Sequence, residues 1–352
     1  MQKSHDARVF DWRVKPDNVS IQARKLHIMN IARRHFLRLG GAAAILPSLP
    51  PMAHAQTYPS RPIQLIVGFP AGGPNDILAR LMAQWLSVRL GQPIVVEDKP
   101  GASSNTATEA VVRAPGDGYT LLLVGPANAI SASLGENLKF NFLRDIAPVA
   151  AILREPLVMV VHVSVPATTA TEFIALAKAS PGKLRMAATG KGSSPHMSGL
   201  LFTIMAEVDL RIVQYSGGGP AIKDMAEGQM DMMFEPMSAA IEAIRAGKLR
   251  ALAVTTSTRS MAMPDVPSLS DAVPGYEASV VTGIGAPANT PADIIERLNA
   301  EINATLADPA VKAHFADTGG IPLGGSPADF GRLLAEETEK WAKVIKTAGA
   351  KL

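Results

Sequence analysis

Short apolar runs recur along the chain, and most are followed by a Gly-, Pro-, Ser- or Asn-rich bend and then by a helical pattern. Short apolar runs that are bounded by such bends are typical of buried strands. Strands that alternate with helices favour an α/β fold with a largely parallel sheet covered on both faces. The runs are IQLIVGF, PIVVED, TLLLV, LVMVV, LRMAA, RIVQY, MDMMF and LRALAV.

Helices are expected where apolar residues recur every three or four positions. One helix follows the first apolar run and ends at Gly91, a second covers residues 107–113, and a third covers TEFIALAKA. For the third helix we expect Thr171 as the N-cap and Pro181-Gly182 as the stop, because these residue types end helices. The apolar face of the first helix comprises Ile77, Leu78, Leu81, Met82, Trp85 and Leu86.

The sequence pattern changes at two places in the chain after residue 55. One lies near residues 161–169, where a strand leads into VPATTA, and the other lies near residues 275–288, where YEASVVTGIGAP leads into a helical tail. The sequence therefore predicts two α/β lobes with two crossings between them. We place the first lobe at residues 56–165 and 281–352 and the second at residues 166–280.

The first 55 residues have the features of an export signal. A twin arginine, Arg33-Arg34, precedes a short apolar run, and Ala53-His54-Ala55 is a small-x-small cleavage site. This pattern predicts a twin-arginine signal, a periplasmic location and a mature start near Gln56. Met29 is an alternative start to Met1 because it gives a signal of normal length. We expect residues 1–28 to be a misassigned or disordered extension.

The charge of the chain is concentrated in this leader. Residues 1–55 carry 9 Lys/Arg and 3 Asp/Glu, which leaves 25 Lys/Arg and 28 Asp/Glu in residues 56–352. Without a basic tract downstream, a nucleic-acid partner is not expected. The absence of cysteine excludes thiol catalysis and cysteine-based zinc, and the histidines show no metal-ligand spacing. We therefore expect no metal and no cofactor.

Four bends in succession open helices, and they are the candidate sites of chemistry. They are FPAGGPND from Phe69, PGASSNT from Pro100, TGKGSSPHMSG from Thr189 and SGGGPAIKD from Ser216; GPANAISAS from Gly125 is a fifth. Each places free backbone N–H groups at the positive end of a helix, which favours an anion. Ligands of open α/β sheets also lie beyond the carboxyl ends of the strands.

The anion that fits these bends best is a carboxylate. No phosphate-binding G-x-x-x-x-G-K-[ST] is present, and Pro195 stands where a dinucleotide motif starting at Gly190 needs its third glycine. A carboxylate needs only two to four donors, which neutral bends supply. A hydrolase is a weaker alternative, because G-x-S-x-G is absent and no acid–base carboxylate pair stands out.

Several polar residues near the bends have two interpretations. Asp76 either complements the dipole of its helix or contacts a ligand, and His196 is either a buried structural histidine or a pocket donor. Glu235, at the end of an apolar run, is either an acid near a helix start or a pocket acid. Lys191 is interpreted as a solvated loop lysine.

The bends and strands together resemble those of the Bug-type extracytoplasmic solute receptors, the substrate-binding components of tripartite tricarboxylate transporters. The resemblance covers nearly the whole chain after the leader. Its motifs occur in order and spacing, from YPSRPIQLIVGFPAGGPNDILAR and LGQPIVVEDKPGASSNTATEAV through APGDGYTLLL, APVAAI, TGKGSSPH, VQYSGGGPAIKDMAEGQMDMMF and AGKLRALAVTTSTR to APANTPADIIERLN.

The resemblance implies a type II periplasmic-binding-protein fold whose two lobes close on one small organic acid, and it implies membrane transporter subunits as partners. It also implies that the first two bends hold a ligand carboxylate mainly through main-chain N–H groups. We expect a monomer without catalytic activity. The binding residues carried over are Phe69, Ala71, Gly72, Asn75, Asp76, Ser103, Ser104 and Asn105 in the first lobe, with Ala127 from the fifth bend, and Thr189, Ser193, Ser194, His196, Ser216, Gly217 and Glu235 in the second.

The sequence departs from the family pattern at three places. The second bend reads Gly-Ala-Ser-Ser where the family usually has Gly-Ala-Gly-Gly, Gly68 stands where a proline is common, and Lys191 is an unusual charge in the third bend. These departures leave the identity of the carboxylate open. They also leave open whether the partner is a transporter or a signalling system.

Overall fold

The structure is a computed structural model that describes residues 58–133, 138–190 and 192–349. The predicted signal, with Met29, and Lys191 lie outside these ranges. Ten strands are found in the described residues. They are β1 (Ile63–Val67), β2 (Ile94–Asp98), β3 (Thr120–Val124), β4 (Ile146–His162), β5 (Arg185–Thr189), β6 (Arg211–Tyr215), β7 (Met232–Pro236), β8 (Leu249–Val254), β9 (Ser279–Pro287) and β10 (Ile321–Pro322).

Eleven helices accompany these strands in the same part of the chain. None of them is both long enough and apolar enough to cross a membrane. They are α1 (Pro74–Leu90), α2 (Asn105–Val112), α3 (Pro126–Ser133), α4 (Phe142–Asp145), α5 (Ala170–Ala179), α6 (Ser194–Met205), α7 (Gly218–Ala226), α8 (Met237–Arg245), α9 (Ala292–Ala307), α10 (Pro309–Asp317) and α11 (Pro327–Ala348).

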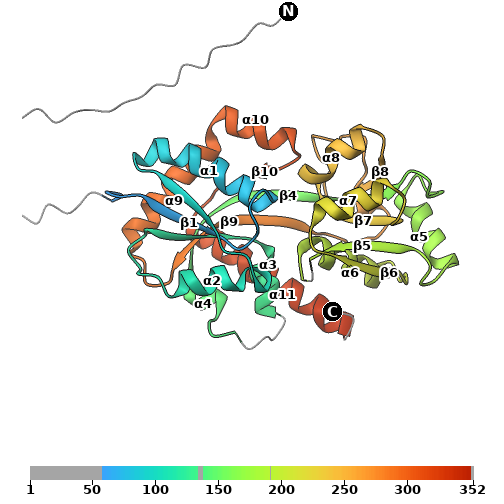
Figure 1. The fold of residues 1–352 in the computed structure, drawn as a ribbon, viewed down its shortest axis with the longest axis horizontal. Coiled ribbons are helices and arrows are strands. Elements are labelled where there is room, and N and C mark those ends of the chain that lie inside the picture. Colours follow the sequence, from blue (N-terminus) through green and yellow to red (C-terminus); the bar gives the residue numbers. More distant parts are fainter. Residues whose placement is uncertain (1–57, 134–137, 191, 350–352) are drawn as a thin grey trace, which may run out of the picture. The chain divides into compact units, whose positions relative to one another are not determined.

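The long strand β4 joins two halves of the sheet (Figure 1). Residues 146–156 of β4 pair with β9, which leads on to β3, β1 and β2. Residues 157–162 of β4 pair with β7 and β8, and β7 leads on to β5 and β6. Each half buries hydrophobic clusters of its own, and β4 and β9 lead from one half to the other.

The two sets of parallel strands run in opposite senses. Strands β1, β2 and β3 are parallel to one another, and two antiparallel pairings, β3 with β9 and β9 with β4, make them run in the same sense as β4. Strand β7 is antiparallel to β4, and β5 and β6 are parallel to β7. The carboxyl ends of β1–β3 therefore point along β4 toward the carboxyl ends of β5–β7.

The helices begin and end mostly where the sequence predicts. The first ends at Gly91, which is left-handed at φ 68° and donates its N–H to Ser87 O. The predicted N-cap of α5 was wrong by two residues. Thr169 caps this helix by accepting a hydrogen bond from Glu172 N at 3.1 Å, because its extended backbone points the hydroxyl at the first turn, whereas Thr171 is already inside the helix.

The C-terminal helix α11 packs against α3 and β4 of one half and α6 of the other. It begins with a capping box between Ser326 and Asp329. Trp341 on this helix is fully buried in a cluster with residues of the second half, and its Nε1 donates to Glu337 Oε2 at 3.0 Å. This helix therefore adds a second tie between the halves.

Replacing Trp341 tests this tie. We expect Trp341→Ala to lower the free energy of unfolding by about 3–5 kcal/mol, because it leaves a large cavity in a closed core. Urea unfolding measures the change. Lys343→Ala is the matched control on the same helix, because its side chain is 75% exposed and we expect no measurable change. Equal stability of the two variants would contradict a structural role for Trp341.

Candidate ligand-binding site

All five predicted bends open helices in the structure. The first, second and fifth follow β1, β2 and β3 and open α1, α2 and α3. The third and fourth follow β5 and β6 and open α6 and α7. Because β1–β3 and β5–β7 point toward each other along β4, the bends form two groups that face each other. The structure thus brings the predicted residues together as two clusters, one in each half.

The first bend is held by its own carboxylate. Gly72, at φ 78°, donates its N–H to Asp76 Oδ2 at 2.7 Å, and Asp76 is only 3% exposed. Arg80 Nε lies 2.6 Å from Asp76 Oδ1 and forms an ion pair with it, but the angle between the two groups does not suit a hydrogen bond. Arg80 Nη2 also donates a hydrogen bond to Asp98 Oδ2 at 3.0 Å. Asp76 therefore fixes the bend through its side chain.

The pKa of Asp76 reflects this arrangement. Burial raises the pKa of the carboxyl, but the Arg80 guanidinium and the Gly72 N–H outweigh burial and lower it below its ordinary value. The pKa of the neighbouring Asp98 is raised, first by burial and then by the charge of Asp76. An ionised Asp76 repels a ligand carboxylate, so main-chain groups of this bend are better donors than its side chain.

The start of α1 supplies such donors. Gly73 is the N-cap, and no side chain caps this helix. Because the first turn of a helix has no intrahelical acceptors, the N–H groups of Asn75 and Asp76 are available in this turn, while Ile77 N–H already bonds Gly73 O. Phe69 is half-buried against the core beside α1, whereas Ala71 is exposed.

The second bend has an unusual backbone. Gly101 is followed by three residues with positive φ, namely Ala102 at 44°, Ser103 at 52° and Ser104 at 73°. L-residues disfavour this region, whereas glycine adopts it freely. The two serines that replace the usual family glycines are therefore held in this conformation at an energetic cost.

Ser104 and Asn105 are buried at the start of α2, and polar contacts link this bend to the fifth. Asn128 Nδ2 donates to Thr108 Oγ1 at 2.8 Å and lies 3.5 Å from Ser104 Oγ, while Asn128 Oδ1 accepts from Gly125 N at 2.8 Å. Asn128 was not identified from the sequence, because an asparagine inside an expected helix gives no distinctive signal. Ala127, which was identified, is buried beside it in α3.

Gly68, which precedes the first bend, lies close to Ser104 in the second bend. A Cβ on Gly68 would overlap the side chain of Ser104 and would lie only 2.7 Å from Ser104 Cα. A residue larger than glycine at position 68 and a serine at position 104 therefore exclude each other. The side chains allowed at positions 68 and 104 therefore depend on each other, which couples the first and second bends.

A double-mutant cycle tests the coupling. We expect Gly68→Ala to destabilise the protein by about 1–3 kcal/mol, because the added methyl forces the two bends apart. Ser104→Gly in that background should recover part of the loss, since it removes the overlapping side-chain atoms, although not Cα, and suits the left-handed backbone. Chemical unfolding of both single variants and the double variant measures the coupling, and strictly additive effects would contradict it.

In the second half, three strand ends converge on Glu235. Glu235 is 3% exposed at the end of β7, and its Oε2 accepts from Thr189 Oγ1 of β5 at 3.3 Å. A Cβ on Gly218, the first residue of α7, would lie 2.5 Å from Glu235 Oε1. The adjacent Gly217 caps α7 through its backbone alone, and Ser216 is exposed. The third and fourth bends are thus brought together around one carboxyl group.

Side chains of the third bend form hydrogen bonds with main-chain groups of the same bend. Ser193 Oγ donates to Thr189 O and accepts from His196 N at 3.4 Å as the N-cap of α6. His196 is 1% exposed, and its Nδ1 accepts the Gly192 N–H at 3.0 Å. In the neutral ring the proton then lies on Nε2. Ser194 is buried in the first turn.

The surroundings of Glu235 favour its neutral form. Burial raises the pKa of Glu235 to about 8; the Thr189 hydroxyl lowers it, and the nearby Glu155 charge raises it further. Glu155 on β4 is buried as well, and its pKa is raised by burial although its Oε1 accepts from Ser238 N at 2.8 Å. At neutral pH Glu235 is mostly protonated, so it is able to donate a hydrogen bond.

This shift predicts a pH dependence of stability. Folding raises the pKa of Glu235 from its ordinary 4.5 to about 8, so the folded state binds the proton more tightly. The stabilising contribution is complete below about pH 4.5 and is lost as the pH rises through 8. We expect Glu235→Gln to reduce the fall in melting temperature between pH 6 and pH 9. Glu242→Gln is the control, because this side chain is exposed, and it should leave the fall in melting temperature unchanged. If Glu235→Gln also left the fall unchanged, the raised pKa of Glu235 would be refuted.

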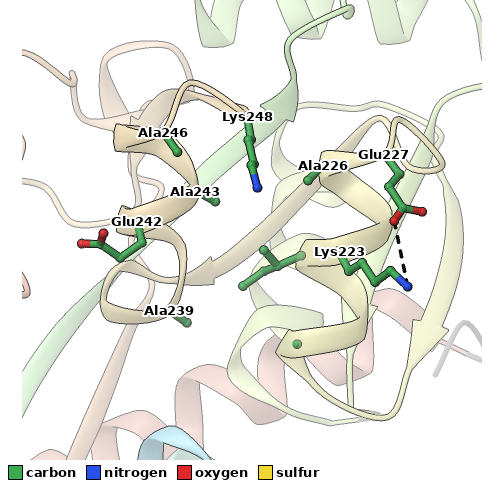
Figure 2. Close-up of a pocket in the computed structure, with 10 residues that line it drawn as sticks. Lys223, Ala226, Glu227, Ala239, Glu242, Ala243, Ala246 and Lys248 are labelled. Carbon is green, nitrogen blue, oxygen red and sulfur yellow. Dashed lines mark ion pairs between the residues drawn. The ribbon is translucent and has the colours of Figure 1, made fainter. Parts of the chain in front are cut away.

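A separate groove lies between α7 and α8 and has a volume of about 620 Å³ (Figure 2). Charged side chains of both signs surround it, with an ion pair of 3.9 Å between Lys223 and Glu227. None of the predicted binding residues lines it. Among the described residues no group of three His, Cys, Asp or Glu side chains is arranged to hold a metal ion.

Comparison with known proteins gives a consistent result. Residues 78–350 match the family described as tripartite tricarboxylate transporter family receptor. Protein BugT of Bordetella pertussis is 38% identical over 301 residues, which cover 85% of this chain and 92% of BugT.

Two solved structures share the fold over most of the chain. The R. palustris protein Rpa4515 with adipate has a TM-score of 0.78 at 35% identity, covering 83% of this chain and 98% of that one. MatC of Rhodopseudomonas palustris with bound malate has a TM-score of 0.74 at 32% identity, covering 82% and 99%. Both contain a small dicarboxylate.

Proposed function

Since the chain belongs to the tripartite tricarboxylate transporter receptor family, we propose that it is a periplasmic solute-binding receptor for a small carboxylated ligand. The ligand binds between the two groups of bends. The lobes are residues 56–165 with 281–352 and residues 166–280, and they close on the ligand about β4 and β9. Export depends on the twin-arginine signal in residues 1–55, and the partners are membrane subunits of a transporter.

The observation that carries this proposal is the opposed direction of the two strand sets. It aims the ends of β1–β3 and of β5–β7 at one region, and the helices α1, α2 and α7 that start there lack a side-chain cap. Helix α6, which also starts there, is capped by Ser193, and α5, α10 and α11 elsewhere are capped by side chains, whereas α9 is not. Uncapped first turns leave N–H donors and a positive dipole for an anion.

The chemistry of the two halves differs in a way that suits a dicarboxylic acid. The first half offers main-chain donors from the starts of α1 and α2. The second half offers the neutral Glu235 beside Thr189 and the start of α7. The adipate and malate in the two solved relatives support this ligand class.

The hydrogen bonds of the third bend are consistent with a protein that binds a ligand without converting it. Ser193 Oγ donates to Thr189 O, and His196 Nδ1 accepts from Gly192 N–H, so this serine and this ring nitrogen are committed to main-chain partners. A hydrolase requires the serine hydroxyl to donate to its base. We therefore propose that the protein acts by binding alone.

A ligand panel tests the proposal. We expect at least one of adipate, malate, citrate, benzoate and nicotinate to raise the melting temperature, because a ligand that binds only the folded state at 100-fold over its Kd stabilises it by about 2.7 kcal/mol. The matched neutral amides should give no shift. Calorimetry confirms the hits, and equal shifts by acids and amides would overturn the carboxylate assignment.

A further inference from the structure

We propose that Thr282 on β9 is a ligand-contact residue whose hydroxyl donates a hydrogen bond to the ligand carboxylate held at the start of α1. This inference rests on the proposed binding function and adds to its site a residue from one of the two strands that link the lobes. Nothing in the surrounding sequence, SVVTGIGAP, marks this threonine except that it is polar within an apolar run.

The hydroxyl of Thr282 is buried without a protein partner. The residue is 3% exposed, and within residues 58–133, 138–190 and 192–349 its Oγ1 has no hydrogen-bond partner. Buried hydroxyls in folded proteins are almost always hydrogen-bonded, so each exception calls for an explanation. A ligand oxygen that arrives on binding supplies the missing partner.

The register of the sheet places Thr282 beside the first and fifth bends. Val124 of β3 is paired with Gly283 of β9, so the next position along β3, Gly125, lies opposite Thr282. A Cβ on Gly125 would lie 3.9 Å from Asn75 Oδ1 and 4.0 Å from Thr282 Cγ2. The Thr282 methyl group and the Asn75 side-chain oxygen therefore both lie near the position that a Cβ of Gly125 would take.

The alternation of β9 shows which face Thr282 occupies. A Cβ on Gly283 would meet Phe330 of α11, so Gly283 faces that helix. Thr282 points to the opposite face, as do Ile284 and Ala286, whose side chains share a core with residues of α1. The Thr282 side chain is thus on the face that α1 covers, near the uncapped first turn that contains Asn75.

These observations define one set of donors. The first turn of α1 offers the N–H groups of Asn75 and Asp76, and Thr282 adds an O–H from the neighbouring strand. Gly125 leaves the space between them open, because a larger residue there would stand against both side chains. A carboxylate has two oxygens with several acceptor positions, so it is able to satisfy both kinds of donor at once.

The test replaces the hydroxyl by a methyl group of similar shape. We expect Thr282→Val to weaken the binding of adipate, malate or citrate, whichever the wild type binds, by about tenfold to hundredfold, the usual range for a hydrogen bond to a charged group. Its melting temperature without ligand should be unchanged or higher, because an unpartnered buried hydroxyl is removed. Thr282→Ser, which keeps the hydroxyl, should bind within a few-fold of the wild type.

Thr290→Val is the matched control. Thr290 is 8% exposed and also carries an unpartnered buried hydroxyl, but it lies beyond the far end of β9, before α9. Calorimetry should show normal affinity for this variant. Normal affinity in Thr282→Val, or an equal loss in Thr282→Ser, would overturn the role of Thr282 while the receptor function stands. Failure of the wild type to bind any of the five acids of the ligand panel would overturn the receptor function, and the contact with it.

Discussion

The direction of strand β4 is the constraint on which the rest of the structure depends. It pairs antiparallel with β9 through its first part and with β7 through its last part. These pairings force β1–β3 and β5–β7 to run toward each other. Since ligands of α/β sheets bind beyond the carboxyl ends of strands, this one shared strand places the two sides of the proposed site opposite each other.

The charged side chains near the first bend contact other groups of the protein, and main-chain N–H groups of the bend face the proposed ligand. Asp76 binds Gly72 N–H and Arg80, and Arg80 in turn binds Asp98. The described residues of the first bend contain no cationic side chain, and Arg80 of α1 is already paired with the carboxylates of Asp76 and Asp98. Main-chain donors at a helix start bind anions, and a carboxylate is one of them.

Much of the fold follows from local sequence signals, and the site follows from them only in part. The apolar runs predicted the eight strands from β1 to β8, and Gly- and Pro-rich bends predicted the starts of five helices, because these signals act over a few residues. The antiparallel course of β4 and β9 depends on long-range pairing, which a single sequence does not encode locally.

The same reason explains the residues that sequence reasoning missed. Asn128 and Thr282 lie in different elements and become relevant only because β1, β3 and β9 are neighbours. The close approach of Gly68 to Ser104 likewise joins two segments that are more than thirty residues apart. The departures from the family pattern were visible in the sequence, but their contact was not.

The central claim is that a ligand carboxylate is held by main-chain N–H groups at the starts of α1 and α2. Amide hydrogen exchange, measured by mass spectrometry with and without a bound acid, tests it most directly. The account predicts that ligand slows exchange in peptides covering residues 69–77 and 101–107 and leaves residues 239–248, on the α8 side of the groove between α7 and α8, unchanged. Protection confined to residues 239–248 would contradict the account and would place the site in that groove (Figure 2).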